Sequence, residues 1–242
     1  IRSYKRKFGP EFGEIVIACD NRHYWRRQFF PNYKANRKKS RADSGFDWNS
    51  IFEALHVALP LKNTDRHISY LPLPHAFERL VTGYLLACGS SIGFMRPGDP
   101  ANLLEDLKAL EPTILPAAPR VLNKIYAAIN LKIQSQHPLV GKVFNMALAS
   151  KVANIKSDEK LDHFIWDKLL FKKIKAGLGL GELRVLISGS APLSPEVHDF
   201  FRALLGIPII QGYGMTENGG ATTLGKDTSD HSTNGHCGGP LP

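Results

Sequence analysis

The chain of 242 residues is long enough for a substantial hydrophobic core, and its apolar content of 43% is typical of a globular protein. Its net charge of +9 comes from residues 1–41, which carry 12 Lys and Arg against 3 Asp and Glu, whereas the remaining residues carry 19 charges of each sign. Three scattered cysteines without a CxxC pair argue against a disulfide framework or a structural zinc site and favour a reducing setting.

No segment predicts a secretory signal or a transmembrane helix. The charged residues 2–7 are not followed by an apolar run, and the most apolar stretch, residues 80–94, is short and interrupted by glycine and serine. The expected location is therefore cytoplasmic, with peripheral attachment to a membrane left open.

The first quarter of the chain predicts a short βα fragment. Residues 14–19 form an apolar run that ends at Asp20, and basic side chains then recur at helical spacing from Lys34 to Arg41. Cations interleaved with aromatic side chains are typical of a surface that follows a nucleic-acid backbone. Nucleic acid is therefore a candidate partner for residues 1–41, and a solvated basic helix is the alternative.

From residue 67 onward, short apolar runs alternate with helical periods. Strands are expected over residues 67–73, 91–94, 113–115, 183–187 and 207–210. Helices are expected over residues 75–88 and across residues 136–180. Three further helices are expected to begin at Asp99 and Pro100, at Pro119, and at Ser194 and Pro195. The first of these three has Leu103, Leu104, Leu107 and Leu110 on one face. This alternation predicts an α/β fold with a mainly parallel sheet and flanking helices.

Two polar turns follow neighbouring strands of this predicted sheet. The first is Ser-Gly-Ser-Ala-Pro (residues 188–192), and the second is Tyr-Gly-Met-Thr-Glu (residues 213–217). Open α/β sheets bind ligands at the carboxyl ends of their strands. The second turn offers an aromatic face, a hydroxyl and a carboxylate, which suit a base, a phosphate and magnesium. Together the two turns indicate a nucleotide site.

These two turns closely resemble those of the adenylate-forming enzymes, specifically the long-chain fatty acyl-CoA synthetases. The resemblance extends to residues 68–79 (ISYLPLPHAFER), to 112–124, and to 235–242 (GHCGGPLP). It covers about residues 57–242 and implies an incomplete adenylate-forming N-terminal domain, that is, a partial AMP-binding domain.

The resemblance also implies a reaction. A fatty acid carboxylate attacks the α-phosphate of ATP to give an acyl-adenylate, and the thiol of coenzyme A then displaces AMP. Tyr213 would stack on adenine, Thr216 would bind the α-phosphate, Glu217 would hold Mg²⁺, and His75 would lie near the acyl carboxylate. The implied nucleotide-binding set is Gly189, Ser190, Ala191, Pro192, Gly212, Tyr213, Gly214, Met215 and Thr216.

Simpler interpretations compete for several of these residues. His75 could instead cap the helix that follows it. A serine hydrolase is rejected because G-x-S-x-G requires glycine where Pro192 stands. His231, His236 and Cys237 match no metal-binding spacing, so a solvated loop is favoured there.

Residues 1–56 resemble part of a bacteriophage-type 5′-nuclease (RNase H) of the flap-endonuclease group. The likeness rests on Cys19-Asp20-Asn21, Tyr24-Trp25-Arg26-Arg27, the helix from Tyr33-Lys34 to Arg37, and Phe46-Asp47-Trp48. It implies that Asp20 binds Mg²⁺ and that Arg26, Arg27, Lys34 and Arg37 contact nucleic acid. Asp20 alone cannot hold the two metal ions that such a nuclease needs.

The resemblance to the synthetases further predicts that this polypeptide is inactive, or very weak, as a ligase. The phosphate loop with its lysine, the ribose-binding aspartate and the C-terminal domain with its catalytic lysine have no counterpart in it. A nucleic-acid-binding module and an inert, mis-assembled product are the competing hypotheses. The acyl chain length, the oligomeric state and the origin of the junction between the two segments stay open.

Overall fold

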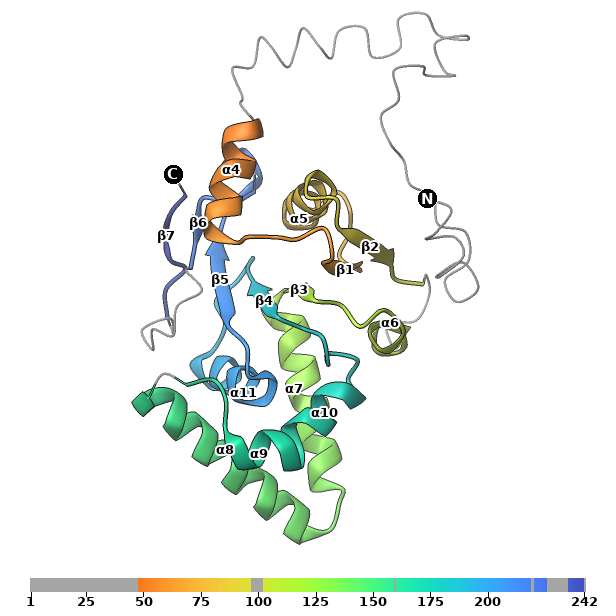
Figure 1. Ribbon diagram of the computed structural model, residues 1–242, viewed down its shortest axis with the longest axis vertical. Helices are drawn as coiled ribbons and strands as arrows, with labels where there is room; N and C mark the ends of the chain where they lie inside the picture. Colours follow the sequence, from red (N-terminus) through yellow and green to blue (C-terminus); the bar gives the residue numbers. More distant parts are fainter. Residues whose placement is uncertain (1–47, 97–101, 159, 219, 226–234, 242) are drawn as a thin grey trace, which may run out of the picture. The chain divides into compact units, whose positions relative to one another are not determined.

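The computed structural model describes residues 48–96, 102–158, 160–218, 220–225 and 235–241. The chain divides into two compact units, Ile1–Glu53 and Ala54–Pro242. The second unit contains the sheet and the helices packed on it (Figure 1). The predicted metal and nucleic-acid residues of the first unit lie outside the described residues, namely Asp20, Arg26, Arg27, Lys34 and Arg37.

The described part of the second unit is organised around a seven-stranded sheet with strand order β2-β1-β3-β4-β5-β6-β7. The pairs among β1 to β5 are parallel, whereas β6 and β7 pair antiparallel, so the predicted mainly parallel sheet is confirmed. The strands are β1 (Arg66–Ser69), β2 (Ser91–Phe94), β3 (Ile114–Ala117), β4 (Val185–Ser188), β5 (Ile209–Tyr213), β6 (Thr223–Leu224) and β7 (Gly239–Pro240).

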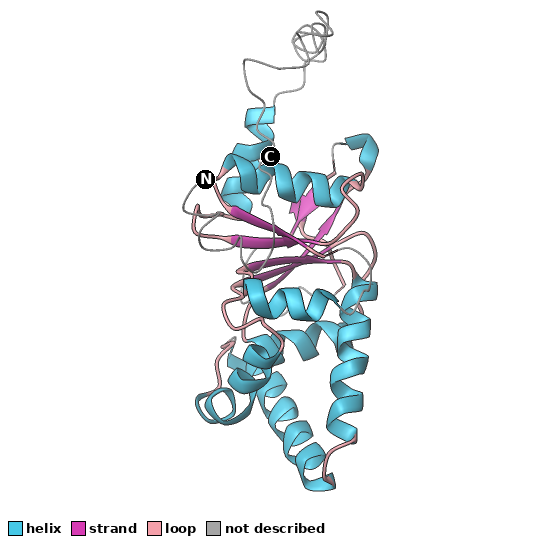
Figure 2. Ribbon diagram, turned by 90° about the vertical axis from the view of Figure 1, so that its right-hand side faces the viewer, coloured by secondary structure: helices cyan, strands magenta, loops and turns pink. Residues whose placement is uncertain are grey.

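Helices cover both faces of this sheet. Helix α5 lies on one face, and α7 and α11 lie on the other (Figures 1 and 2). The helices are α4 (Trp48–Ala58), α5 (Ala76–Ala87), α6 (Asn102–Leu110), α7 (Pro119–Gln134), α8 (Pro138–Asp158), α9 (Phe164–Trp166), the π-helix η1 (Asp167–Phe171), α10 (Lys172–Gly177), α11 (Pro195–Leu205) and the 3₁₀ helix η2 (Thr216–Asn218). Among the described residues, none of these helices combines the length and apolarity that a bilayer crossing requires.

The central strands explain why the sequence folds in this way. Every residue of β3 and of β4 is buried, as expected for parallel strands covered on both faces. Helix α11 between β4 and β5 is delimited by local signals. Ser194 accepts a hydrogen bond from the N–H of Val197, Pro195 opens the helix, and Gly206 ends it with φ of 61°. These bounds confirm the predicted start of α11.

Several predicted bounds differ from the structure. Strand β1 ends at Ser69 rather than at residue 73. Leu104 is 43% exposed, because the packed face of α6 is centred on Leu107 and Leu110. The predicted cap Asp99 and Pro100 lie outside the described residues.

Asp65 joins the amino-terminal ends of three strands. Its carboxylate accepts hydrogen bonds from the Arg184 guanidinium (Nε, 2.8 Å), the Thr113 hydroxyl (2.7 Å) and the N–H of Lys62 (2.7 Å). Burial by itself would raise the pKa of Asp65, but these donors outweigh it and the pKa is lowered. The carboxylate therefore stays ionised and ties β1, β3 and β4 together.

A second buried pair fastens α5 to β1. The His67 Nε2 atom and the Glu78 Oε1 atom are 3.1 Å apart, and both side chains are fully buried. Burial would raise the pKa of Glu78, yet the hydrogen bond with His67 contributes to a net lowering. This contact holds the first turns of α5 at a defined height over the sheet.

Substitution of Gly179 tests how tightly the second unit is packed. Its φ is +72°, and a Cβ at this position would overlap backbone atoms of Leu107 and Lys108. We expect Gly179→Ala to lower the free energy of unfolding by about 3 kcal/mol or more, because overpacking adds to left-handed strain. Gly177→Ala is the matched control, since a Cβ there meets nothing within 4 Å. Urea unfolding measures both variants, and equal midpoints would contradict the prediction.

Candidate functional site

A pocket of about 330 Å³ opens at the carboxyl ends of β4 and β5. It is bordered by the turn after β4 and by the segment that runs from the end of β5 into η2. The structure brings most of the predicted site residues to this pocket. They are His75, Gly189, Ser190, Gly212, Tyr213, Gly214, Met215, Thr216 and Glu217.

Strand pairing brings the two turns together. Strands β4 and β5 are parallel neighbours, with Ser188 opposite Gln211. Gly189 and Gly212 follow these positions directly, and a Cβ on Gly189 would lie 3.4 Å from the carbonyl oxygen of Gly212. The two turns thus meet at one edge of the sheet, as the sequence predicted.

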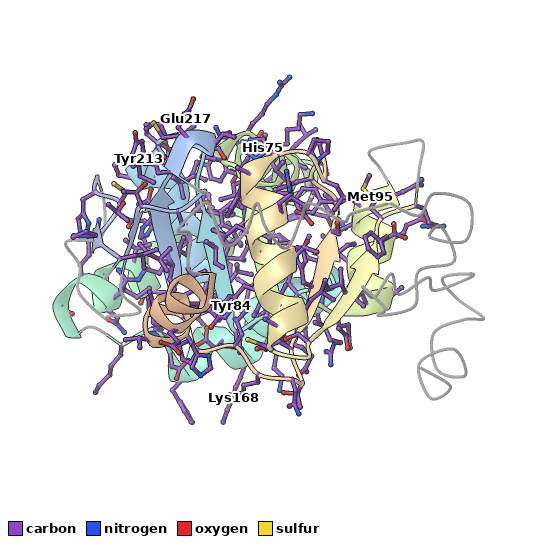
Figure 3. The ribbon with its side chains drawn as sticks, turned by 90° about the horizontal axis from the view of Figure 1, so that it is seen from above. His75, Tyr84, Met95, Lys168, Tyr213 and Glu217 are labelled. Atoms are coloured by element: carbon purple, nitrogen blue, oxygen red, sulfur yellow. The ribbon has the colours of Figure 1, made fainter. Side chains whose placement is uncertain are left out.

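Tyr213 lies at the mouth of the pocket. Its side chain is 49% exposed, which leaves its ring available to a ligand. Figure 3 shows Tyr213, Glu217 and His75 on one side of the molecule. Tyr213 belongs to strand β5, however, because β6 pairs with Gly212 and Tyr213 and extends the strand beyond residue 210. The backbone under the ring is therefore held by the sheet.

The turn after β4 has an unusual backbone. Ser190 has φ of 73°, in the left-handed region that residues other than glycine rarely adopt. Such conformations cost on the order of 1–3 kcal/mol and gather at ligand sites. The neighbouring Ser188 is one of the residues around the pocket, and its hydroxyl is buried without a hydrogen-bond partner among the described residues.

The segment after β5 is held in a tight turn. A Cβ on Gly214 would overlap the backbone of Gly220, so this position requires glycine. The N–H of Gly220 donates to the carbonyl of Met215 (3.0 Å). Thr216 and Glu217 stand on η2 with exposed side chains and line the pocket. A hydroxyl and a carboxylate are thus presented next to Tyr213.

His75 has the capping role that the sequence left as an alternative. Its Nδ1 accepts a hydrogen bond from the N–H of Phe77 (3.2 Å) at the start of α5. The same side chain lines the pocket. Because Nδ1 acts as an acceptor, the proton of the neutral ring is on Nε2. His75 therefore combines a structural cap with a polar group at the pocket wall.

An apolar arm of the pocket was missed by the sequence analysis. Helix α5 lines it with Phe77, Leu80, Val81 and Tyr84, at the i, i+3, i+4 and i+7 spacing of a single helical face. Further lining residues come from other segments: Leu55, Leu59, Leu61, Ile114, Ile187, Ala221, Thr223 and Leu224. The helical spacing within α5 was visible in the sequence, but the contribution of Leu55, Leu59 and Leu61 was not.

Tyr84 closes the arm in a fixed orientation. Its hydroxyl donates to the carbonyl of Leu59 (2.9 Å) and lies 3.0 Å from the Nδ1 atom of His56. Burial raises its pKa well above the ordinary value, so the hydroxyl stays neutral. The arm is therefore uncharged at this position.

Other predicted residues fall outside the cavity. Ala191 and Pro192 continue the first turn on the surface and do not line the pocket. No group of three His, Cys, Asp or Glu side chains within the described residues could hold a metal ion. His231 lies outside the part of the chain that the structure describes.

Comparison with known proteins identifies relatives. Residues 48–242 match the AMP-binding enzyme family. Long-chain-fatty-acid–CoA ligase 5 of Mus musculus is 42% identical over 177 residues, which cover 73% of this chain and 25% of that protein. Long chain acyl-CoA synthetase 3 of Arabidopsis thaliana is 38% identical over 184 residues, which cover 75% and 27%. The chain thus spans about a quarter of the length of these relatives.

Solved structures share the fold. The inhibitor-bound N-terminal domain of FACL13 from Mycobacterium tuberculosis aligns with a TM-score of 0.52 and 18% identity, over 78% of this chain and 36% of that one. ATP-bound MatB from Rhodopseudomonas palustris aligns with a TM-score of 0.51 and 22% identity, over 80% and 29%. None of these likenesses supports the nuclease resemblance of residues 1–56. From the match over residues 48–242, the chain belongs to the AMP-binding enzyme family.

Proposed function

We propose that this chain is the nucleotide-binding part of an ATP-dependent long-chain fatty acid–CoA ligase. The observation that carries the proposal is a single pocket with a polar mouth, formed by two strand ends, and an apolar arm along α5. A nucleotide suits the polar mouth, and an aliphatic tail suits the arm. The similarity to long-chain fatty acid–CoA ligases of mouse and rat supports the same substrate class.

Adenine would bind against Tyr213, whose exposed ring stands on the paired end of β5. The turn of Gly189, Ser190, Ala191 and Pro192 would border the base and the ribose. Gly212 and Gly214 would border the nucleotide with their backbone, which is held close to β6 and to the turn at Gly220 because neither residue carries a side chain. Met215 also lines the pocket and would continue the wall of the nucleotide site beyond Gly214.

The triphosphate would lie over η2. Thr216 would donate its hydroxyl to the α-phosphate, and Glu217 would hold Mg²⁺. Magnesium bound to nucleotides takes one or two carboxylates together with phosphate oxygens and water, so the single carboxylate of Glu217 fits such an ion. The ion would neutralise negative charge on the phosphates.

A fatty acid would bind with its chain in the apolar arm and its carboxylate near His75. Positioning this carboxylate against the α-phosphate is the main catalytic task, because no nucleophilic side chain is needed. The product of the first step would be the acyl-adenylate, and the thiol of coenzyme A would then displace AMP. For the present polypeptide alone we expect nucleotide binding with little or no turnover.

Substitution of Tyr213 tests the nucleotide site. We expect Tyr213→Ala to weaken AMP binding about tenfold, because base stacking on an aromatic ring contributes about 1–3 kcal/mol. Tyr213→Phe, which keeps the ring, should bind AMP like the unmodified chain. Isothermal titration calorimetry measures both variants. Equal affinity of the Ala variant and the unmodified chain would reject Tyr213 as the stacking residue.

Substitution of Glu217 tests the magnesium role. In the unmodified chain, ATP should bind more tightly with Mg²⁺ than with a chelator. Glu217→Gln should lose most of this difference, because the amide has no negative charge for the ion. Glu182→Gln, at another exposed carboxylate, is the control. A full magnesium effect in the Glu217→Gln variant would exclude the carboxylate as a ligand.

Substitution of Leu80 tests the apolar arm. We expect Leu80→Gln to weaken binding of cis-parinaric acid roughly tenfold, because an amide buried against the chain costs about 1–3 kcal/mol. Leu86→Gln, on the 55% exposed side of the same helix, should leave this affinity unchanged. Fluorescence titration gives both values, and AMP affinity should stay constant throughout. Unaltered fatty acid binding in the Leu80 variant would place the acyl chain elsewhere.

A further inference from the structure

The segment of α7 to α10 carries much of the positive charge of the second unit. Residues 119–177 contain 11 Lys and Arg but only 4 Asp and Glu. One of these acids, Asp167, is bound to the buried Lys151 and so contributes no free negative charge. Among the described residues, no ion pair involves five exposed lysines: Lys132, Lys142, Lys168, Lys172 and Lys173.

The same helices expose large apolar side chains. Of the fifteen exposed large apolar side chains in the described residues, eight lie between residues 131 and 169. They are Leu131, Leu139, Val140, Val143, Met146, Phe164, Ile165 and Leu169. Phe164 is 79% exposed and Leu131 is 70% exposed. Exposed apolar side chains concentrated in this way mark an interaction surface rather than ordinary scatter.

Contacts bring together the helices that carry seven of these side chains, all except Leu131 on α7. The rings of Phe144 on α8 and Phe171 on η1 lie 6.2 Å apart, and Ser150 on α8 lies 3.3 Å from His163 before α9. The segment from α9 to α10 therefore runs along α8. Leu139, Val143 and Met146 recur at i, i+4 and i+7, so they share one side of α8.

The lysines and the apolar side chains are interleaved. Lys168 lies over the ring of Phe164, with its Nζ atom 4.3 Å from the ring centroid. Lys172 follows Lys168 by one helical turn. A lysine can lay its aliphatic stem on an apolar surface and keep its ammonium group in the polar layer above it. We call this basic and apolar surface of α8, α9, η1 and α10 the basic apolar face.

We propose that the basic apolar face docks on an anionic lipid bilayer. Helices that lie in a membrane interface typically carry lysines next to aliphatic and aromatic side chains. Each lysine near an anionic surface contributes about 1 kcal/mol of attraction. Nucleic acid fits less well, because only Phe164 among these eight exposed apolar side chains is aromatic, and the aliphatic ones offer neither a stacking surface nor a hydrogen-bond donor.

The basic apolar face is separate from the pocket. In Figure 3, Lys168 lies on the opposite side of the view from His75, Tyr213 and Glu217. Docking would therefore leave the pocket mouth uncovered. The proposal does not depend on the proposed ligase function.

Vesicle flotation with the full chain tests the proposal. The chain should float with phosphatidylcholine vesicles that contain phosphatidylserine, less so in high salt, and little with phosphatidylcholine alone. Lys168→Glu with Lys172→Glu should lower the partition coefficient roughly tenfold or more. Lys62→Glu with Lys108→Glu changes the net charge equally on other surfaces and should have much less effect. Equal losses in both double variants, or none in either, would overturn the proposal.

Two further readouts separate specific docking from general charge attraction. In a chain with Trp25→Phe and Trp48→Phe, Trp166 is the remaining tryptophan, and lipids with brominated acyl chains should quench its fluorescence. Phe164→Ser with Ile165→Ser should weaken vesicle binding even in low salt. Unquenched Trp166 would overturn the proposal. So would a result in which the Lys168 and Lys172 variant loses affinity for a short RNA but keeps its affinity for vesicles.

Discussion

The parallel pairing of β4 with β5 is the constraint on which the pocket depends. Parallel neighbours end at the same edge of a sheet, so the turn that follows each strand reaches one corner. Strand β4 is fully buried, and helix α11, which is capped at both ends, connects it to β5. Gly189 then allows the first turn to lie against the backbone of Gly212 in the second. Tyr213 gains its defined position because β6 pairs with the end of β5.

Helix α5 connects the polar and apolar parts of the pocket. Its cap, His75, stands at the polar mouth, and one face of the helix lines the apolar arm. The buried pair of His67 and Glu78 fixes this helix over β1. At the other end of the strands, Asp65 ties β1, β3 and β4 together through Arg184 and Thr113. Polar contacts thus hold a frame in which most of the stabilisation comes from apolar burial.

The proposed ligase pocket and the proposed membrane-docking surface are different parts of the molecule, but both would bind molecules with long acyl chains. A fatty acid is far more soluble in a bilayer than in water, because each buried methylene contributes about 0.8 kcal/mol. A chain that docks on a membrane through the basic apolar face would therefore meet fatty acid, its proposed substrate, at high local concentration. Because the pocket lies on another side of the molecule, its mouth would stay accessible to nucleotide while the chain is docked.

Local signals in the sequence determined the elements with strong caps and turns. Strand β2 and the start of α11 were predicted at their observed positions, since these depend on residues next to each other in the chain. The same is true of the two site turns, whose residue types suit a nucleotide. Only the tertiary structure decided that Gly212 and Tyr213 belong to β5, that Leu104 is exposed, and that Leu55, Leu59 and Leu61 line the pocket. These features depend on pairing and packing between segments far apart in the sequence, and no local pattern encodes which segments meet.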